Sequence, residues 1–344
     1  MKLPSGFQTV EALELFLSFP VRRVVDALRA LDGDVMILGV GGKMGPTLAM
    51  LARRAIEQGG LDKRVIGVSR FSNAAARARL QQAGVETIAC DLMDDEALSA
   101  LPDAPNIVYM AGMKFGATGQ EPRTWAMNAF LPGRVMQRFR QSRIVLFSSG
   151  NVYPLTPVVA GGCTEQTSPA PVGEYAQSVL GRERIFEYFA AQSGAPGLIF
   201  RLNYAVEMRY GVLLDVAQRV WAGTPIDLSM GHVNVIWQGD ANAYALCALA
   251  LAESPPRVLN ITGPETISIR HLAIQFGALL GREPALVGVE QPNALLSNAG
   301  AAFKLLGYPR VPLAQIVEWV AAWVKAGGPT LDKPTKFQVR DGRF

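Results

Sequence analysis

The chain has 344 residues, of which 49% are hydrophobic and 18% are charged. This composition excludes a disordered or fibrous protein and suits a compact enzyme with one large domain and a smaller lobe. The net charge is +4, without a basic run that alternates with aromatic residues. Nucleic acid is therefore not expected as a partner, whereas an anionic cofactor is compatible with the charge.

The positions of cysteine and histidine and the length of the apolar runs argue against disulfide-rich, metal-binding and membrane-spanning proteins. The three cysteines lie far apart and the two histidines lack ligand spacing, so we expect neither a disulfide framework nor a metal site. No apolar run approaches the ~20 residues that span a bilayer. The first residues also lack the charge order of a signal peptide. We therefore expect a cytoplasmic protein without membrane contact.

Residues 1–34 carry charges among apolar residues at helical spacing, which predicts an N-terminal extension of one or two amphipathic helices. Over residues 35–205, short apolar runs alternate with helical stretches. Strands are predicted at 35–40, 64–70, 85–92, 106–112, 143–149 and 197–204, and helices at 46–59, 73–84, 125–142 and 174–194. This alternation predicts an α/β fold with a doubly wound parallel (Rossmann) sheet, which would form a dinucleotide-binding domain.

Beyond residue 205 the alternation becomes less regular. Short strands at 232–237 and 257–263 are mixed with helices at about 240–253, 269–281 and 312–326. Residues 206–328 are therefore predicted to form a smaller mixed α/β substrate lobe with elements that return to the main sheet. The polar residues 329–344 are predicted to form an extended tail.

The segment GVGGKMG (39–45) follows the first predicted strand and opens a helix. Gly39, Gly42 and Gly45 permit a tight turn and let backbone N–H groups approach a pyrophosphate, and the helix start adds a positive dipole end. Lys43 and Met44 belong to the same turn. A strand, a glycine turn, a helix and a second strand together predict a dinucleotide site.

The end of the second predicted strand indicates which dinucleotide binds. An acidic residue there would favour NAD(H), but this strand ends at Ser69 and Arg70, whose donors suit a 2′-phosphate. The sequence therefore favours NADP(H), and NAD(H) remains possible. Asp91 and Leu92 follow the third strand, where the Asp91 side chain can accept a hydrogen bond from the adenine amino group.

Further motifs occur along the chain in a definite order. They are CDL (90–92), MAG (110–112, with Ala111 and Gly112), Asn128 in WAMNAF, SSGNVY (148–153), Tyr175, and GDANAYALCALA followed by LNITGPETISIRHLA. Together with the glycine turn, they resemble the extended short-chain dehydrogenase/reductase family, the NAD(P)-dependent sugar epimerase/dehydratase group, over about residues 35–325. The resemblance implies a nicotinamide cofactor that passes Ala111 and Gly112.

The resemblance also implies a set of catalytic residues. Ser149 would donate a hydrogen bond to the substrate oxygen, Tyr175 would move the proton as general acid/base, and Asn128 would help to hold the site. The family's lysine, four residues after the tyrosine, lowers the phenol pKa, but this chain has Val179 there. We hypothesise that Lys114, in the loop after the fourth strand, supplies the missing charge. The alternative is that Lys114 is a solvated loop residue.

Two departures from the resemblance bear on the substrate. Dehydratases of the family carry an acidic pair after the catalytic hydroxyl, where this chain has Gly150 and Asn151. Nucleotide-sugar epimerases carry a diphosphate-binding arginine at a place that corresponds to about Val233, which disfavours a nucleotide-linked sugar. The residues left to orient a smaller polar or carboxylated substrate are Arg201, Asn203 and Arg209.

These observations lead to three possible functions. The first is an oxidoreductase that transfers hydride between NADP(H) and a hydroxyl or keto group of a sugar, sugar acid or related small polar compound. The second is a sugar epimerase that retains its cofactor, and the third is a non-catalytic NAD(P)-binding sensor. By analogy with the family, the long helices at 125–142 and 174–194 predict a homodimer formed through a four-helix bundle.

Overall fold

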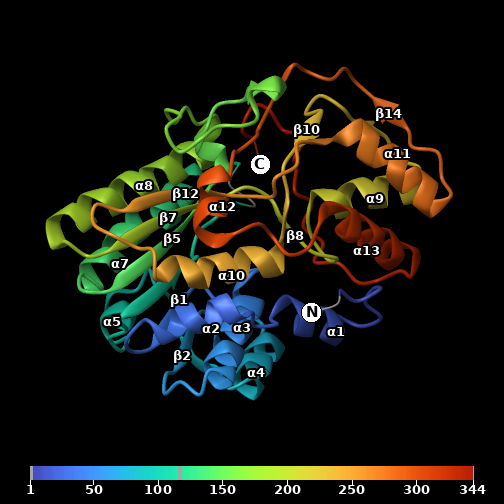
Figure 1. Ribbon diagram of the computed structural model, residues 1–344. Coiled ribbons are helices and arrows are strands. Elements are labelled where there is room, and N and C mark those ends of the chain that lie inside the picture. The colour runs from blue at the N-terminus through green and yellow to red at the C-terminus, as the bar shows by residue number, and fades with distance from the viewer. Residues whose placement is uncertain (1–2, 115–117, 344) are drawn as a thin grey trace.

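A seven-stranded parallel sheet forms the centre of the computed structural model, which describes residues 3–114 and 118–343 (Figure 1). The strand order is β12-β7-β5-β4-β1-β2-β3. The strands are β1 (Val35–Leu38), β2 (Val65–Ser69), β3 (Glu86–Ala89), β4 (Asn106–Tyr109), β5 (Arg143–Ser149), β7 (Gly197–Leu202) and β12 (Arg257–Ile261). The predicted doubly wound fold is confirmed. The chain order reverses between β1 and β4, and this switch point is where such sheets bind ligands.

Helices cover both faces of the sheet, because alternate residues of a strand point to opposite sides. Val35 and Ile37 of β1 pack with helices of one face, whereas Met36 and Leu38 pack with helices of the other. The first face carries α2 (Arg22–Arg29), α3 (Gly45–Gln58), α10 (Gln238–Leu249) and α12 (Gly300–Leu306), and the second carries α5 (Asp95–Ser99), α7 (Leu131–Arg138) and α8 (Gly173–Ser193). Helix α4 (Ala74–Gln82) packs against β3 and α3.

The structure divides the helix predicted at 125–142. Its parts are α6 (Glu121–Trp125), a π-helical turn η1 (Ala126–Phe130) and α7. Pro132 has no N–H to donate to the carbonyl four residues earlier, and this carbonyl, of Asn128, accepts a hydrogen bond from Arg182 Nε at 3.1 Å. The π-helical turn is thereby tied to α8, beside the candidate site.

A second core lies in the C-terminal lobe, to one side of the sheet (Figure 1). Its helices are α1 (Val10–Leu17), α9 (Val212–Ala222), α11 (Ile269–Leu280) and α13 (Leu313–Lys325). Leu13 and Leu17 of α1 are buried in this core, whereas α2 packs on α3 and α10. The N-terminal helices therefore do not form one separate unit: α1 packs with the lobe and α2 packs with the sheet.

Short paired strands complete the lobe and the loops above the sheet. They are β8 (Ala205–Val206) with β11 (Ile236–Trp237), β9 (Ile226–Asp227) with β14 (Leu286–Val287), β10 (His232–Val233) with β13 (Ile267–Ser268), and β6 (Thr156–Pro157) with β15 (Asn293–Ala294). Two 3₁₀ turns, η2 (Gly150–Val152) and η3 (Val158–Ala160), follow β5 and β6. In the part of the chain that the structure describes, no helix is both long and apolar enough to pass through a bilayer.

The residues after α13 fold back over the molecule. Residues 329–343, the C-terminal strap, contain no helix or strand, but Thr335 and Phe337 are buried. Phe337 packs in the core of the lobe. The predicted extended tail is thus a packed segment with an apolar anchor.

Candidate functional site

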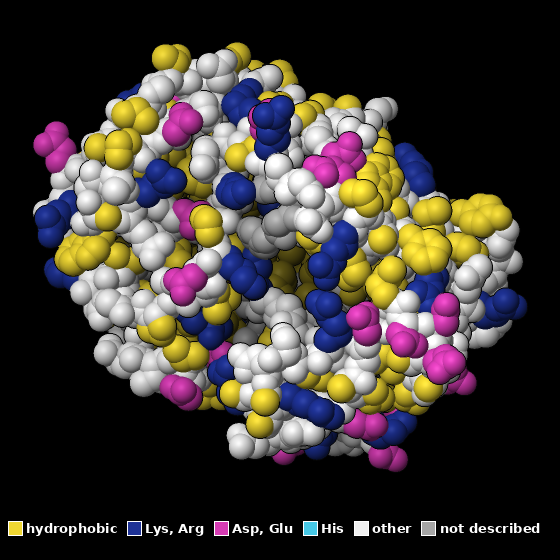
Figure 2. All heavy atoms as spheres, turned by 180° about the vertical axis from the view of Figure 1, so that it is seen from behind, with side chains coloured by type: hydrophobic (Ala, Val, Ile, Leu, Met, Phe, Trp, Pro, Cys, Tyr) yellow, Lys and Arg dark blue, Asp and Glu magenta, His cyan; other side chains and the backbone are white. Residues whose placement is uncertain are grey.

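A pocket of about 170 Å³ opens at the carboxyl end of β5. Ser149 is the last residue of β5, and its hydroxyl accepts a hydrogen bond from the Asn151 backbone N–H at 3.2 Å. The same hydroxyl donates to Asn151 Oδ1 at 2.9 Å. The first turn of η2 thus fixes the orientation of the Ser149 side chain at the pocket wall. On the face seen in Figure 2 the surface is hollowed, and several Lys and Arg side chains lie around the hollow.

Tyr175 reaches the same pocket from the first turn of α8. Burial raises the pKa of its phenol, while the Arg182 charge and a hydrogen bond with Ser149 act in the opposite direction. The hydroxyl of Ser149 and the phenol of Tyr175 are therefore close enough to share one substrate oxygen. This is the juxtaposition that the sequence predicted.

Val179 lies one helical turn after Tyr175 and is 1% exposed. It packs in a small cluster with Val152, Tyr153 and Cys163, against which Tyr175 also packs. The position at which the resemblance implied a lysine is thus filled by an apolar contact.

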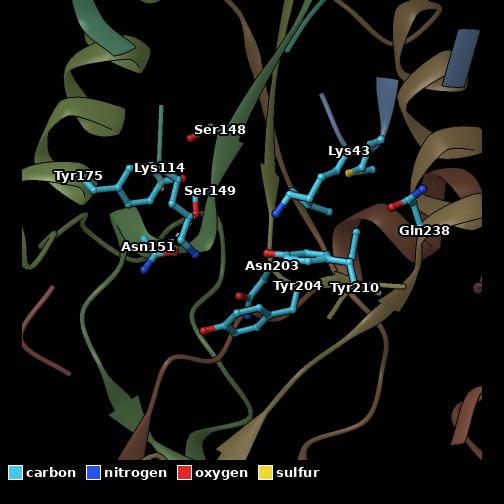
Figure 3. Close-up of a pocket in the computed structure, with 13 residues that line it drawn as sticks. Lys43, Lys114, Ser148, Ser149, Asn151, Tyr175, Asn203, Tyr204, Tyr210 and Gln238 are labelled. Carbon is cyan, nitrogen blue, oxygen red and sulfur yellow. Dashed lines mark hydrogen bonds between the residues drawn. The ribbon is translucent and has the colours of Figure 1, made fainter. Parts of the chain in front are cut away.

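Lys114 lies beside Tyr175, on the loop after β4. Its Nζ lies 5.6 Å from the ring centroid of Tyr175 and 5.9 Å from that of Tyr204. Burial lowers the pKa of Lys114 to about 8. An ammonium close to a phenol favours the phenolate. That Lys114 acts in this way on Tyr175 stays a prediction. Figure 3 shows Lys114, Ser149 and Tyr175 together on one side of the pocket.

Asn128 lies outside the pocket and holds the loop that carries Lys114. Its side chain accepts from Met113 N at 2.8 Å and donates to the Met113 carbonyl at 2.8 Å and to Ser178 Oγ at 3.0 Å. Arg182 Nη2 donates to Asn128 Oδ1 at 2.8 Å, and Arg182 Nη1 donates to the Phe147 carbonyl at 2.8 Å. These bonds fix Asn128, and hence the backbone next to Lys114, against α8 and β5.

Arg182 was not among the predicted site residues. It lies seven residues after Tyr175, on the same face of α8 but two turns further along. In the structure its guanidinium is buried and faces inward, and its charge acts on the Tyr175 phenol. The signal in the sequence was the i, i+7 spacing combined with Pro132, which interrupts the neighbouring helix.

The far side of the pocket carries two tyrosines and a second lysine that the sequence did not assign to it. Tyr204 and Tyr210 both line the pocket, and Tyr204 adopts φ +48°, a left-handed conformation that is rare for an aromatic residue. Lys43 Nζ lies 3.3 Å from the centroid of the Tyr210 ring. Figure 3 shows Lys43 and Tyr210 facing Ser149 across the pocket. Lys43, predicted at the cofactor, thus also borders the substrate side.

Asn203 is placed where the sequence predicted a substrate contact. It lines the pocket and is 2% exposed, and its Nδ2 has no hydrogen-bond partner among the described residues. A buried donor of this kind is costly to leave unsatisfied, so a ligand acceptor at this point would be bound favourably.

The structure does not bring the two candidate arginines to this pocket. Buried Arg209 donates to Glu207 Oε1 at 2.9 Å and to Glu14 Oε1 at 2.8 Å. Buried Arg201 donates to Glu183 Oε2 at 2.6 Å. Each guanidinium is held by carboxylates because a buried charge requires a partner. The prediction that Arg209 orients the substrate receives no support from its position.

A longer cleft, of about 440 Å³, runs from the pocket mouth along the strand ends β1, β2, β3 and β4. Its volume lies within the ~300–1,000 Å³ typical of ligand sites. The predicted cofactor residues that line it are Gly39, Gly42, Ser69, Arg70, Asp91, Leu92, Ala111 and Gly112. Lys114 lines both the cleft and the pocket, so the two spaces meet beside Tyr175. Of the remaining predictions, Met44 lines the pocket and Gly45 is buried at the start of α3.

The glycine turn fits the pyrophosphate of a dinucleotide. Gly39 has φ +91°, and a Cβ there would lie 2.6 Å from the backbone N of Ala111. A Cβ at Gly41 would lie 2.5 Å from Ser69 Oγ. At Gly42, in contrast, the nearest atom would be 3.4 Å away. The turn is pressed against the ends of β4 and β2 and leaves its outer side accessible to a ligand.

Lys43 makes the stability of the protein depend on pH. Burial, followed by the charges of Lys114 and Lys333, lowers the pKa of Lys43 to about 6. The usual lysine pKa is about 10.4, so between about pH 6 and 10 the unfolded chain binds more protons than the folded one, and stability rises with pH. We expect Lys43→Met to remove this contribution. The variant should therefore have a higher Tm than the wild type at about pH 6. This difference in Tm should be several degrees smaller at about pH 9, since a change of 1 kcal/mol in stability shifts Tm by about 2–4 °C.

Thermal unfolding at several pH values measures this effect, with Lys325→Met, an exposed lysine of α13, as the control. The same pH dependence in the wild type and in Lys43→Met would show that burial of the Lys43 ammonium carries no cost.

The family follows from a match over the region that builds this site. The profile described as "NAD dependent epimerase/dehydratase family" matches residues 35–206. The chain belongs to this family. It is therefore an enzyme of the extended short-chain dehydrogenase/reductase type with a nicotinamide dinucleotide cofactor, as predicted. No curated protein matches the sequence. Among the described residues, no three His, Cys, Asp or Glu side chains are grouped as metal ligands.

Solved structures of similar fold agree with this assignment. Pal from Bacillus thuringiensis has 16% identity and a TM-score of 0.70, with 85% of this chain and 99% of that chain covered. UDP-glucuronic acid 4-epimerase from Bacillus cereus, in complex with NAD, has 17% identity and a TM-score of 0.70, with 85% and 98% covered. UDP-glucose 4-epimerase from Thermotoga maritima has 15% identity and a TM-score of 0.69, with 86% and 99% covered. At these identities the likeness concerns the fold.

Proposed function

We propose that this epimerase/dehydratase-family enzyme exchanges hydride between a nicotinamide dinucleotide and a hydroxyl or keto carbon of a small carbohydrate-like compound, such as a sugar or sugar acid. The observation that carries the proposal is the convergence of Tyr175, Ser149 and Lys114 where the pocket meets the cleft. The bound cofactor supplies the hydride acceptor or donor. The protein must then bind and orient the substrate and move the proton of its oxygen.

The roles of the side chains follow from their contacts. Tyr175 transfers the proton to or from the substrate oxygen. The Ser149 hydroxyl, which donates to Asn151 Oδ1 in the free protein, turns to donate to the same substrate oxygen. Lys114 favours the phenolate form of Tyr175 by its charge. Asn128 and Arg182 are positioning residues, since they hold the backbone of Met113 next to Lys114.

The pocket favours a small substrate. Its volume of about 170 Å³ lies below the ~300 Å³ at which drug-sized ligand sites begin. It is lined by polar groups, among them Asn203, Tyr204 and Tyr210, but by no arginine among the described residues. Val233, at the place of the diphosphate-binding arginine, is buried. These features support a free sugar or sugar acid, although the solved epimerases named above act on UDP-linked sugars.

Epimerisation with a retained cofactor is the second candidate, because the matching family is described as one of epimerases and dehydratases. The dehydratase route lacks its acidic pair, since Gly150 and Asn151 occupy those positions. The retained Ser149 and Tyr175 argue against a non-catalytic sensor.

One experiment separates these functions. The purified enzyme is incubated with NADPH or NADP⁺ and a panel of aldoses, ketoses and uronic acids. Absorbance is followed at 340 nm, and products are separated by anion-exchange chromatography. A steady absorbance change identifies a reductase or dehydrogenase, and an isomer formed without absorbance change identifies an epimerase. Bound dinucleotide with neither result across the panel would contradict the proposal.

We further propose NADP(H) as the preferred dinucleotide, because Arg70 and Ser69 line the cleft at the end of β2. Arg70→Gln is expected to raise the Kd of NADPH about tenfold or more and to leave that of NADH within about twofold, because only the former has a 2′-phosphate for the guanidinium. Fluorescence titration measures both constants, with Arg123→Gln, an exposed residue of α6, as the control. An equal change for both dinucleotides would remove Arg70 from the choice between them.

The homodimer and the cytoplasmic location remain proposals. Phe130 and Tyr188, on η1 and α8, are 59% and 57% exposed, and such rings suit a helical interface between two copies. Analytical ultracentrifugation tests the dimer.

A further inference from the structure

The C-terminal strap crosses from the lobe to the start of α8 and is fixed along its length. Leu331 N donates to the Arg209 carbonyl at 3.0 Å. Thr335 donates to Asp215 Oδ2 from both its backbone N, at 2.8 Å, and its hydroxyl, at 2.5 Å. Arg340 Nη1 donates to the Asn293 carbonyl at 3.0 Å. The strap therefore has a defined position relative to the domain that carries the cleft.

Lys333 lies between the first two of these anchors, at an exposed position. It lines the dinucleotide cleft together with Gly41, Gly42 and Arg70. It also lines an adjoining hollow of about 340 Å³, which Gly41 and Gly42 share. The strap thus places Lys333 at the glycine turn, although the two lie 288 or more residues apart in the chain.

The adjoining hollow carries an excess of positive charge. Its charged lining residues are Glu14, Lys43, Arg79, Arg209 and Lys333. Glu14 is paired with both Arg79, at 3.0 Å, and Arg209, at 2.8 Å. Because Glu14 is engaged by these two arginines, it does not offset the charge of Lys333, and that charge contributes to the lowered pKa of Lys43. An arrangement of this kind attracts an anion.

We propose that the C-terminal strap is part of the dinucleotide site and that Lys333 contacts a phosphate group of the bound dinucleotide. This inference rests on the proposed use of a dinucleotide and adds a residue from outside the sheet domain to its site. The phosphate could be the pyrophosphate, which binds at the glycine turn, or the 2′-phosphate, which Arg70 would face. Both are anions that an ammonium on this rim would bind.

The test uses Lys333→Met in the full-length protein, because removal of the strap would also remove the buried Phe337. Loss of one charge-assisted contact is expected to raise the Kd of NADPH about tenfold and to weaken its dependence on salt. Lys336→Met is the matched control, since it removes the same charge three residues later in the strap, outside the lining of the cleft and hollow. It should change the Kd by less than about twofold.

Titration with both NADPH and NADH separates the two phosphates. Equal loss for both dinucleotides identifies the pyrophosphate, and loss for NADPH alone identifies the 2′-phosphate. Either result supports the proposal. In a second readout, NADPH should slow acetylation of the Lys333 amine by acetic anhydride in the wild type, as followed by mass spectrometry. An unchanged Kd in Lys333→Met would overturn the proposal, whereas failure of the wild type to bind either dinucleotide would overturn the proposed function itself.

Discussion

Replacing Tyr175 by phenylalanine is expected to lower kcat by about 10²–10⁴-fold while leaving the Kd of the dinucleotide within about twofold. The variant keeps the ring that packs against Val152, Tyr153 and Val179, so the start of α8 should stay in place. The variant loses the hydroxyl that forms a hydrogen bond with Ser149, which is also the group proposed to accept or donate the substrate proton. Steady-state kinetics and dinucleotide titration measure the two quantities separately.

Tyr308→Phe provides the matched control, because it makes the same change at a side chain that is 67% exposed. It should leave both kcat and Kd unchanged. A Tyr175→Phe variant that retains more than about a third of wild-type kcat would show that another group moves the proton.

Replacing Lys114 by methionine is the second large expected effect. The positive charge 5.6 Å from the Tyr175 ring favours the phenolate, so its loss should raise the pKa of that phenol. Oxidation of an alcohol requires the phenolate as base. The rise of kcat/KM with pH should therefore shift to higher pH by about one unit, with kcat at neutral pH about tenfold lower or less.

The charge itself is tested by Lys114→Arg, which should restore part of the neutral-pH activity, and by Lys304→Met, an exposed lysine on α12. The latter should behave as the wild type. An unchanged pH profile in Lys114→Met would mean that Lys114 does not replace the missing lysine, and Arg182 would remain as the charge that acts on Tyr175.

The sequence by itself determined the sheet and the cofactor end of the site. Apolar runs of four to seven residues that alternate with helical segments can be buried only in a parallel sheet covered on both sides. The strands and their order along the chain could therefore be predicted. The glycine turn, Ser69, Arg70 and Asp91 follow strand ends directly in the chain. Because carboxyl ends of parallel strands lie at one edge, local position was enough to bring these residues together.

The position of the proposed catalytic pair could be predicted for the same reason. Ser149 ends β5, and Tyr175 begins the next long helix, so their places in the chain fixed their places at the sheet edge. The sequence also showed Val179 at the position where the resemblance implied a lysine. The sequence did not show which charged group lies near Tyr175 instead, since any segment that packs nearby can supply a charge.

Only the tertiary structure decided which distant groups share the site. Arg182 contacts Asn128 because the π-helical turn before Pro132 packs on α8, and Arg209 lies outside the pocket because Glu14 of α1 binds it. Lys333 reaches the glycine turn because Thr335 and Phe337 anchor the strap. These contacts join residues that lie far apart in the chain. Packing and the need to pair buried charges select the partners, and neither leaves a periodic pattern or a fixed spacing in the sequence.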